Sequence, residues 1–214
     1  MNKFLMLLAF SLLSLAVASA NPLPCTLTGS ATLSGASNAT TVTCGSMTFN
    51  NFEVLSPTGG APGIVDITQM TDCGSEVCLS FNPNLTANQD EEFLFTVSGG
   101  VNDIDMSVGG QNASITETAC SVPVPTSGIT LGICPAQDLL GQITVASNSP
   151  NQPVFSAPFP VTSPVYIFKD IDAGAGGALS EFTQSFSTPE PVSMVLLGSG
   201  LLGLGLLRRR SRKN

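Results

Sequence analysis

The sequence predicts an all-β fold, specifically an antiparallel β-sandwich of jelly-roll or immunoglobulin-like type. Short runs that alternate apolar with small polar residues recur along the chain, and clusters rich in Gly, Pro and Asn separate them, which is typical of strands joined by turns. Charged residues make up only 10% of the 214 residues, so there is little material for solvent-facing helices. One sandwich of about ten to twelve β elements fits this length.

Each predicted strand rests on its own local pattern. The clearest is 91–97, in which Phe93, Phe95 and Val97 share one face. The Gly- and Asn-containing stretch 109–112 predicts a turn, and 172–178 predicts another turn between the two closing strands. The predicted strands with clear patterns are 25–33, 39–44, 46–55, 64–70, 77–81, 91–97, 101–108, 113–120, 165–171 and 179–186, and weaker patterns lie at 129–133, 142–146 and 154–155.

The first twenty residues have the form of a secretory signal peptide, which we assign to 1–20. Lys3 supplies the positive start, 4–17 the apolar stretch, and Ala18-Ser19-Ala20 a small-residue cleavage site. The mature chain is therefore expected to begin at Asn21. Its β domain is expected to cover 21–187.

The last segment, 188–214, has three parts in a fixed order. Pro189-Glu190-Pro191 is followed by an apolar run over 192–207 and then by a basic cluster that begins with Arg208-Arg209-Arg210. The apolar run has 16 residues and would measure about 24 Å as a helix. It is slightly shorter than a stable membrane span, which needs roughly 17–25 residues. The arginines are expected to stay on the cytoplasmic side. These features predict temporary retention in a membrane, and a simple tail anchor is the alternative.

The three parts of this tail together resemble the PEP-CTERM sorting signal of Gram-negative bacteria. The resemblance covers 188–214 and rests on the Pro189-Glu190-Pro191 motif, the Leu/Gly-rich run and the arginines behind it. It implies export by the Sec machinery, transient residence in the inner membrane, and recognition and cleavage of the tail by an integral-membrane exosortase. It further implies a mature protein at the cell surface or outside the cell that accompanies extracellular polysaccharide.

The six cysteines all fall within 21–187 and predict three disulfides. An even number of cysteines behind a signal peptide is typical of an oxidising compartment. Local pairing is expected, because each local pair brackets one hairpin or turn. A zinc site is the alternative, but the chain has no His and no pair of C-x-x-C motifs. The expected disulfides are Cys25–Cys44, Cys73–Cys78 and Cys120–Cys134.

Charge excludes one class of partner. Between the two terminal segments only Lys169 is basic, against fourteen of the fifteen acidic residues, which gives 21–187 a formal charge of −13. A domain with one lysine has no electrostatic footprint for a phosphate backbone, so we expect no nucleic acid partner. The shortage of internal cations favours divalent ions instead.

The residue types also argue against catalysis. Without His, neither a Ser-His-Asp nor a Cys-His arrangement can form. Glycoside hydrolysis needs only two carboxylates, but Tyr166 is the single tyrosine and there is no Trp, so the usual platforms for sugar rings are missing. We therefore expect no enzyme and no catalytic residues. The carboxylates available to a hydrolase would be Glu91, Glu92, Asp103, Asp105 and Glu117.

Calcium is the one cofactor that the sequence suggests. The stretch 170–181 places Asp170, Asp172 and Glu181 at positions 1, 3 and 12, as in an EF-hand loop. Gly174 at position 5 offers no side-chain oxygen, and Ala175 stands at position 6 where Gly is required. A Gly-rich turn with solvated carboxylates is the favoured interpretation, so no cofactor and no metal ligands are assigned.

These observations lead to one expected function and two alternatives. We expect a non-catalytic, structural or adhesive component of the cell surface or extracellular polysaccharide matrix. A carbohydrate- or calcium-dependent binding module is the first alternative, and a carboxylate glycoside hydrolase is the second.

Overall fold

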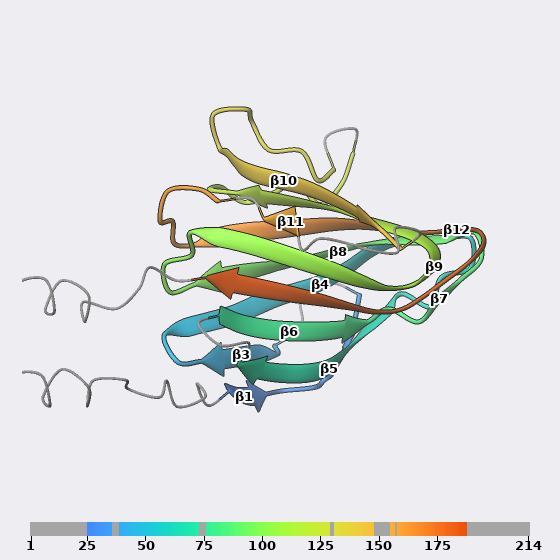
Figure 1. Ribbon diagram of the computed structural model, residues 1–214, viewed down its shortest axis with the longest axis horizontal. Coiled ribbons are helices and arrows are strands. Elements are labelled where there is room, and N and C mark those ends of the chain that lie inside the picture. Colours follow the sequence, from blue (N-terminus) through green and yellow to red (C-terminus); the bar gives the residue numbers. More distant parts are fainter. Residues whose placement is uncertain are drawn as a thin grey trace, which may run out of the picture.

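The computed structural model describes residues 25–35, 39–72, 76–128, 131–147, 155–156 and 158–187. Within these ranges the chain is all-β and antiparallel, with no helix, as the sequence predicts (Figure 1). The strands are β1 (Cys25–Thr28), β2 (Thr32–Ser34), β3 (Thr41–Cys44), β4 (Met47–Thr58), β5 (Ile64–Asp72), β6 (Glu76–Asn82), β7 (Leu85–Thr86), β8 (Gln89–Ser98), β9 (Asp103–Cys120), β10 (Leu139–Ala146), β11 (Phe155–Ser156) and β12 (Val165–Ser187).

Two long strands, β9 and β12, form the ribbon around which the others are arranged. They pair antiparallel from Tyr166↔Cys120 at one end to Ser187↔Asp103 at the other. The first half of β12 also pairs with β8, and its second half pairs with β6. The main strand order is therefore β1-β3-β4-β8-β12-β6-β5-β2, while β10 and β11 pair with β9.

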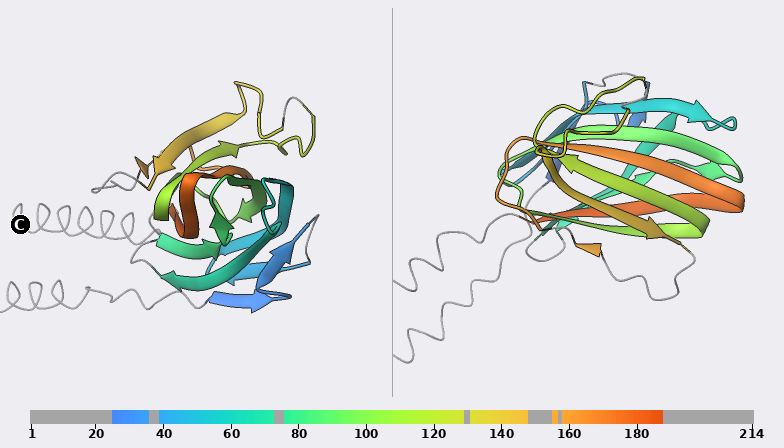
Figure 2. Two further views of the ribbon diagram at one scale, coloured as in Figure 1. Left: turned by 90° about the vertical axis from the view of Figure 1, so that its right-hand side faces the viewer. Right: turned by 90° about the horizontal axis from the view of Figure 1, so that it is seen from above.

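The halves of this ribbon belong to two layers that face each other, as the views in Figure 2 show. The ring of Phe81 on β6 lies 5.2 Å from that of Phe93 on β8, although these two strands do not pair. Phe49 on β4 similarly lies 5.1 Å from Phe186 in the second half of β12. Both separations are in the range of favourable aromatic pairs. A phenylalanine-rich core thus fills the space between the layers.

Close backbone approach at the middle of the ribbon explains how both strands bend together. A Cβ on Gly110 would lie 2.4 Å from the carbonyl oxygen of Ala178, and one on Gly177 would lie 2.4 Å from that of Asn112. Only glycine fits at such separations. Asn112 adopts the left-handed conformation (φ 49°), which asparagine tolerates, and its side-chain amide donates to the carbonyl of Ala175 at 2.6 Å.

Two predicted turns are therefore wrong. The stretch 109–112 was expected to separate two strands, and 172–178 was expected to separate two others, but β9 and β12 each continue through them. Each turn signature lies opposite the other, with register shifts between Ala173 and Ala178 and between Leu179 and Glu181. The strands β9 and β12 stay paired on both sides of these shifts because they bend at the same place.

Other boundaries differ in smaller ways. The predicted strand 25–33 is two strands, because β1 pairs with β3 whereas β2 pairs with β5. Of the predicted strand 129–133, the described residues 131–133 are not strand, and 131–132 form a turn. The predicted strand 154–155 overlaps the short β11 at Phe155, and residue 154 lies outside the described residues.

The disulfides follow the expected local pairing where it is described. Cys25–Cys44 joins the paired strands β1 and β3, and Cys120–Cys134 joins the end of β9 to the connection that leads to β10. Cys78 on β6 is also disulfide-bonded. Its predicted partner, Cys73, lies outside the described residues.

Candidate functional site

The most unusual residue of the described fold is Lys169, on the first half of β12. It is the single basic residue of the described ranges, and its side chain is completely buried (0% exposed). Lysine is almost never fully buried unless its ammonium group is paired. The contacts that compensate for this burial therefore define the candidate site.

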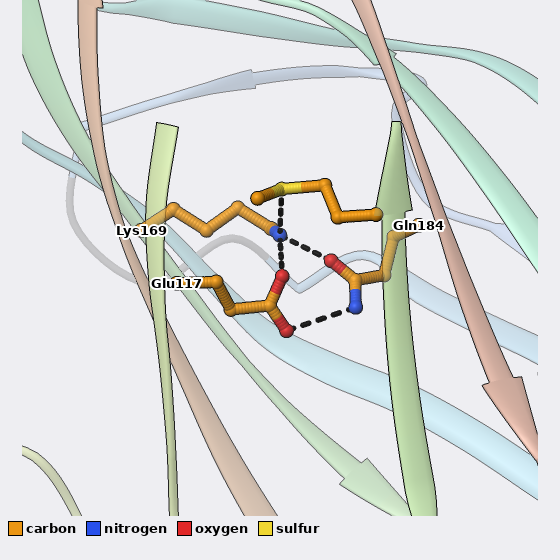
Figure 3. Close-up of polar contacts among 4 residues, drawn as sticks. Glu117, Lys169 and Gln184 are labelled. Atoms are coloured by element: carbon orange, nitrogen blue, oxygen red, sulfur yellow. Dashed lines mark hydrogen bonds and ion pairs between the residues drawn. The ribbon is translucent and has the colours of Figure 1, made fainter. Parts of the chain in front are cut away.

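Glu117 and Gln184, both also 0% exposed, surround the Lys169 amine, and the three side chains point toward one another (Figure 3). The Nζ atom donates to Oε2 of Glu117 and to Oε1 of Gln184. The Nε2 atom of Gln184 donates to Oε1 of Glu117 at 2.8 Å, which closes a ring of three polar groups. We call Glu117, Lys169 and Gln184 the buried triad.

Apolar and weakly polar groups complete the surroundings of the amine. The Sδ atom of Met106 accepts a long hydrogen bond from Nζ at 3.4 Å, and the ring centroid of Phe182 lies 5.1 Å from Nζ. The second contact is in the range of a cation–π interaction. A thioether and an aromatic ring solvate an amine much less well than water does, so the triad lies in a region of low polarity.

The bend of the β9–β12 ribbon brings the triad together. Lys169 and Glu117 are direct register partners in one half of the ribbon, and Gln184 and Met106 are direct partners in the other half. The two pairs therefore come from opposite layers and meet across the core. Strand alternation turns each side chain inward, because Lys169 lies between the buried Ile167 and Ile171.

Burial favours the neutral forms of the two ionisable members. Desolvation is the main influence on both groups: it lowers the pKa of Lys169 below its ordinary value and raises the pKa of Glu117 above its own. The attraction between the two groups and the hydrogen bonds to the carboxyl oppose these shifts. Because desolvation can exceed the Coulombic gain, a buried ion pair is weak support for a purely stabilising role.

A second charged region, the acidic strip, lies along the paired strands β8 and β12. Asp90 is the register partner of Asp172, and Glu92 is the partner of Asp170. Burial and the charges of Asp170 and Asp172 raise the pKa of Asp90 to about 6. Burial also raises the pKa of Asp170. The acidic strip thus gathers carboxylates on one face of the sheet, whereas the single lysine of the described residues, Lys169, turns into the core.

Glu91 is the most perturbed carboxyl next to the acidic strip. Its side chain is fully buried, and Asp90 and Glu92 are its neighbours in sequence. Burial raises its pKa to about 7, and the charges of its two neighbours act in the same direction, while the nearby backbone N–H of Gly63 acts against them. A substantial fraction of Glu91 is therefore protonated at neutral pH.

The carboxylates singled out from the sequence do not form one site. Glu117 belongs to the buried triad, whereas Glu91 and Glu92 lie at the acidic strip. Asp103 and Asp105 stand at the start of β9, where Asp103 accepts a hydrogen bond from the backbone of Ile104 at 2.9 Å. Asp105 lines a hollow of about 250 Å³ with Met106, Ser107 and Ser185. Of these five carboxylates only Asp105 lines this hollow, whose other carboxylate is that of Glu76.

The stretch 170–181 does not have the form of an EF-hand loop, because it is extended strand with a bend. Asp170 pairs with Thr116, whereas Glu181 lies beyond the bend and accepts a hydrogen bond from Thr68 at 3.3 Å. Among the residues that the structure describes, no three His, Cys, Asp or Glu side chains are grouped to hold a metal ion.

The single tyrosine lines a shallow surface hollow. Tyr166 borders a space of about 180 Å³ together with Asn51, Pro123, Val124 and Thr126. One aromatic side chain and few convergent polar groups do not make a built ligand site. The hollow therefore supports no specific ligand.

The sorting features of the sequence lie outside the described residues. These are the signal peptide 1–20, Pro189-Glu190-Pro191, the apolar run 192–207 and Arg208-Arg209-Arg210. Within the described part of the chain, no helix has the length and apolarity to cross a membrane. No protein-family model matches the chain, and no curated protein matches it in sequence.

Sequence reasoning missed the buried triad, although a signal for it exists. Each member interrupts a row of apolar residues at alternate positions: Glu117 between Ile115 and Ala119, and Gln184 between Phe182 and Phe186. Lys169 interrupts such a row in the same way. Polar residues at inward positions of period-2 strands are expected to meet a partner in the core.

Proposed function

We propose that this chain is an exported, non-catalytic component of the cell surface or the extracellular polysaccharide matrix, with a structural or adhesive role. The two described disulfides support the proposal most directly, because such bonds form and persist in oxidising compartments. The signal peptide and the tail that resembles a PEP-CTERM signal supply the route: Sec-dependent export, a transient stay in the inner membrane and cleavage by an exosortase.

The architecture supports a structural role more than a catalytic one. The described domain has a dense aromatic core between its two layers, which is the feature that supports a structural role. We propose that its two layers form a β-sandwich of the jelly-roll rather than the immunoglobulin-like type. Cys25–Cys44 joins neighbouring strands, whereas the immunoglobulin hallmark is a disulfide between sheets that packs on a tryptophan, and this chain has no Trp.

The intact mass of the protein recovered outside the cells tests the route. Processing predicts a chain that starts at Asn21, ends near Thr188 and lacks Arg208-Arg209-Arg210. A matched variant with all three residues of Pro189-Glu190-Pro191 replaced by Ala should remain in the membrane fraction with its tail intact. Recovery of the extracellular protein with the tail still attached would overturn exosortase processing in favour of a tail anchor.

A further inference from the structure

We propose that Lys169 and Gln184 join in an intramolecular amide bond, with Glu117 as the proton carrier for the reaction. The bond would form between Nζ of Lys169 and Cδ of Gln184 inside the folded core. This inference does not depend on the proposed function, because it rests only on the buried triad.

The reacting groups are already in contact. The Nζ atom touches Oε1 of Gln184 (Figure 3). The carboxamide carbon Cδ, which the amine would attack, is bonded directly to that oxygen. Positioning of this kind converts a slow bimolecular aminolysis into an intramolecular step. The partners come from two halves of one bent strand, 15 residues apart in sequence.

Glu117 touches both nitrogen atoms whose protons must move. Its Oε2 atom accepts from Nζ of Lys169, and its Oε1 atom accepts from Nε2 of Gln184 at 2.8 Å. The same carboxyl can therefore take a proton from the attacking amine at one oxygen and deliver one to the leaving nitrogen at the other. A carboxyl group within hydrogen-bond reach of both atoms is the geometry of general acid–base catalysis.

The step balances without any further reagent. The Nζ–Cδ bond forms, the Cδ–Nε2 bond breaks, and the neutral amine gives up one proton while the leaving amide nitrogen gains one. The products are one new amide and one molecule of ammonia. No oxidant, reductant or cofactor takes part.

The environment favours this reaction over its competitors. An amine must be neutral to attack, and the burial that lowers the pKa of Lys169 favours that form. The raised pKa of Glu117 lets its carboxyl hold the transferred proton. All three side chains are fully buried, so bulk water is kept from hydrolysing the intermediate or the product.

Condensation of Lys169 with Glu117 itself would be the competing link, because these groups are also in contact. That reaction must expel water and would consume the only acid of the triad. The remaining contacts of Nζ, from Gln184 and the Met106 sulfur, offer no acid to protonate the leaving oxygen. Attack on Gln184 is therefore the favoured course.

The bond would fasten the two layers to each other through the core. Lys169 lies in the half of β12 that pairs with β8, and Gln184 lies in the half that pairs with β6. A covalent link across the bend would close a loop within β12 and reduce the conformational freedom of the unfolded chain, as a disulfide does. Unlike the disulfides, it would survive reducing agents.

Mass spectrometry of the purified, folded and then reduced full-length protein tests the proposal. We expect a mass lower than that of its chain by one ammonia. After unfolding and digestion by a glutamyl endopeptidase that cleaves after Glu181, the fragments that carry Lys169 and Gln184 should remain joined. The joined fragments exclude loss of ammonia elsewhere, for example from an asparagine. An unchanged mass, or loss of one water with a link to Glu117, would overturn the proposal.

Matched variants test the roles of the three groups. Glu117→Gln and Lys169→Arg should give the full mass, because the first lacks the proton carrier and the second the nucleophile. Gln184→Glu should lose water in place of ammonia and reach the same final mass as the linked wild type. Full conversion of Glu117→Gln, with folding checked by circular dichroism, would overturn the role of Glu117. If a variant fails to fold, the wild-type measurement alone still decides whether the bond exists.

Discussion

The buried triad and the acidic strip lie next to each other on β12, yet the surroundings of their ionisable groups are opposite. Lys169 turns into the core and meets Glu117 and Gln184 at hydrogen-bonding contact. Asp170, the next residue, turns outward and faces Asp90, Glu92 and Asp172. The Lys169 amine is thus surrounded by hydrogen-bonding partners, whereas the Asp170 carboxyl lies among other carboxyl groups.

This difference shows that the lysine does not serve to balance the negative domain. A cation placed on the acidic strip would relieve repulsion among its carboxylates, at little desolvation cost. Instead the only lysine of 21–187 lies where hydration is lost completely. Such a costly placement is typical of a group with a specific chemical task.

The largest expected effect comes from breaking the buried triad. Glu117→Ala leaves the Lys169 amine buried without its carboxylate, and removal of one partner of a buried pair destabilises a protein by about 3–5 kcal/mol. Urea unfolding at constant pH measures the free energy of unfolding. The matched control is Glu181→Ala, also on the β9–β12 ribbon but exposed, which should change that free energy by less than about 0.5 kcal/mol. Equal effects of both variants would contradict the assigned importance of the triad.

The next largest effect is the pH dependence of the free energy of unfolding that Glu91, beside the acidic strip, should cause. Its folded pKa of about 7 exceeds its ordinary value of 4.5, so the folded protein binds this proton more tightly than the unfolded chain does. The resulting stability is fully present below pH 4.5 and is lost as the pH rises through 7. At about 1.4 kcal/mol per pKa unit, the loss is on the order of 3 kcal/mol. The raised pKa of Asp90 acts in the same direction.

Glu91→Gln tests the assignment of this pH dependence. The variant has no proton to lose, so its free energy of unfolding should vary less between pH 5 and pH 8 than that of the wild type. Denaturant unfolding at several pH values provides the comparison, and Glu181→Ala again serves as a control with the wild-type slope. A wild type that gains stability steadily from pH 5 to pH 8 would show that the assigned direction is wrong.

A smaller effect is expected from Gly177→Ala at the bend that brings the triad together. The new methyl would lie 2.4 Å from the carbonyl oxygen of Asn112, so the ribbon must open locally. Overpacking of this kind costs about 1–3 kcal/mol. Gly174→Ala is the matched control, because its methyl meets Asn112 no closer than 3.3 Å. If amide bond formation proceeds as proposed, Gly177→Ala should also slow it, as the unlinked mass fraction of freshly folded protein would show.

The sequence allowed much of this fold to be predicted, but only as separate pieces. Alternation placed the strand 91–97 correctly within β8, and local pairing placed Cys25–Cys44 and Cys120–Cys134 correctly. The two wrong turns have one cause: Asn112 and Gly177 are local turn signals, but their strands bend against each other and stay paired. Local patterns do not report that a distant strand bends at the same point.

The buried triad was hidden for a related reason. Lys169 and Glu117 are 52 residues apart in sequence, and their pairing depends on the register of β9 with β12. Their inward positions can be deduced from alternation, but the identity of each partner cannot. Gln184 adds a further step, because it reaches the pair only after the ribbon bends. Which residues meet at this site is therefore determined by the strand topology and not by the local sequence.

The smallest expected effect is that of added calcium, which tests whether the acidic strip is a metal site. Asp90, Asp170 and Asp172 lie together, yet the described residues contain no group of three ligands arranged for a metal ion. Screening of repulsion by a divalent ion is then expected to be weak and similar for Ca²⁺ and Mg²⁺. Isothermal titration and thermal unfolding with each ion measure this directly. Saturable heat with Ca²⁺ alone, lost in Asp172→Asn, would instead make the acidic strip a calcium site and favour a calcium-dependent binding module over a purely structural protein.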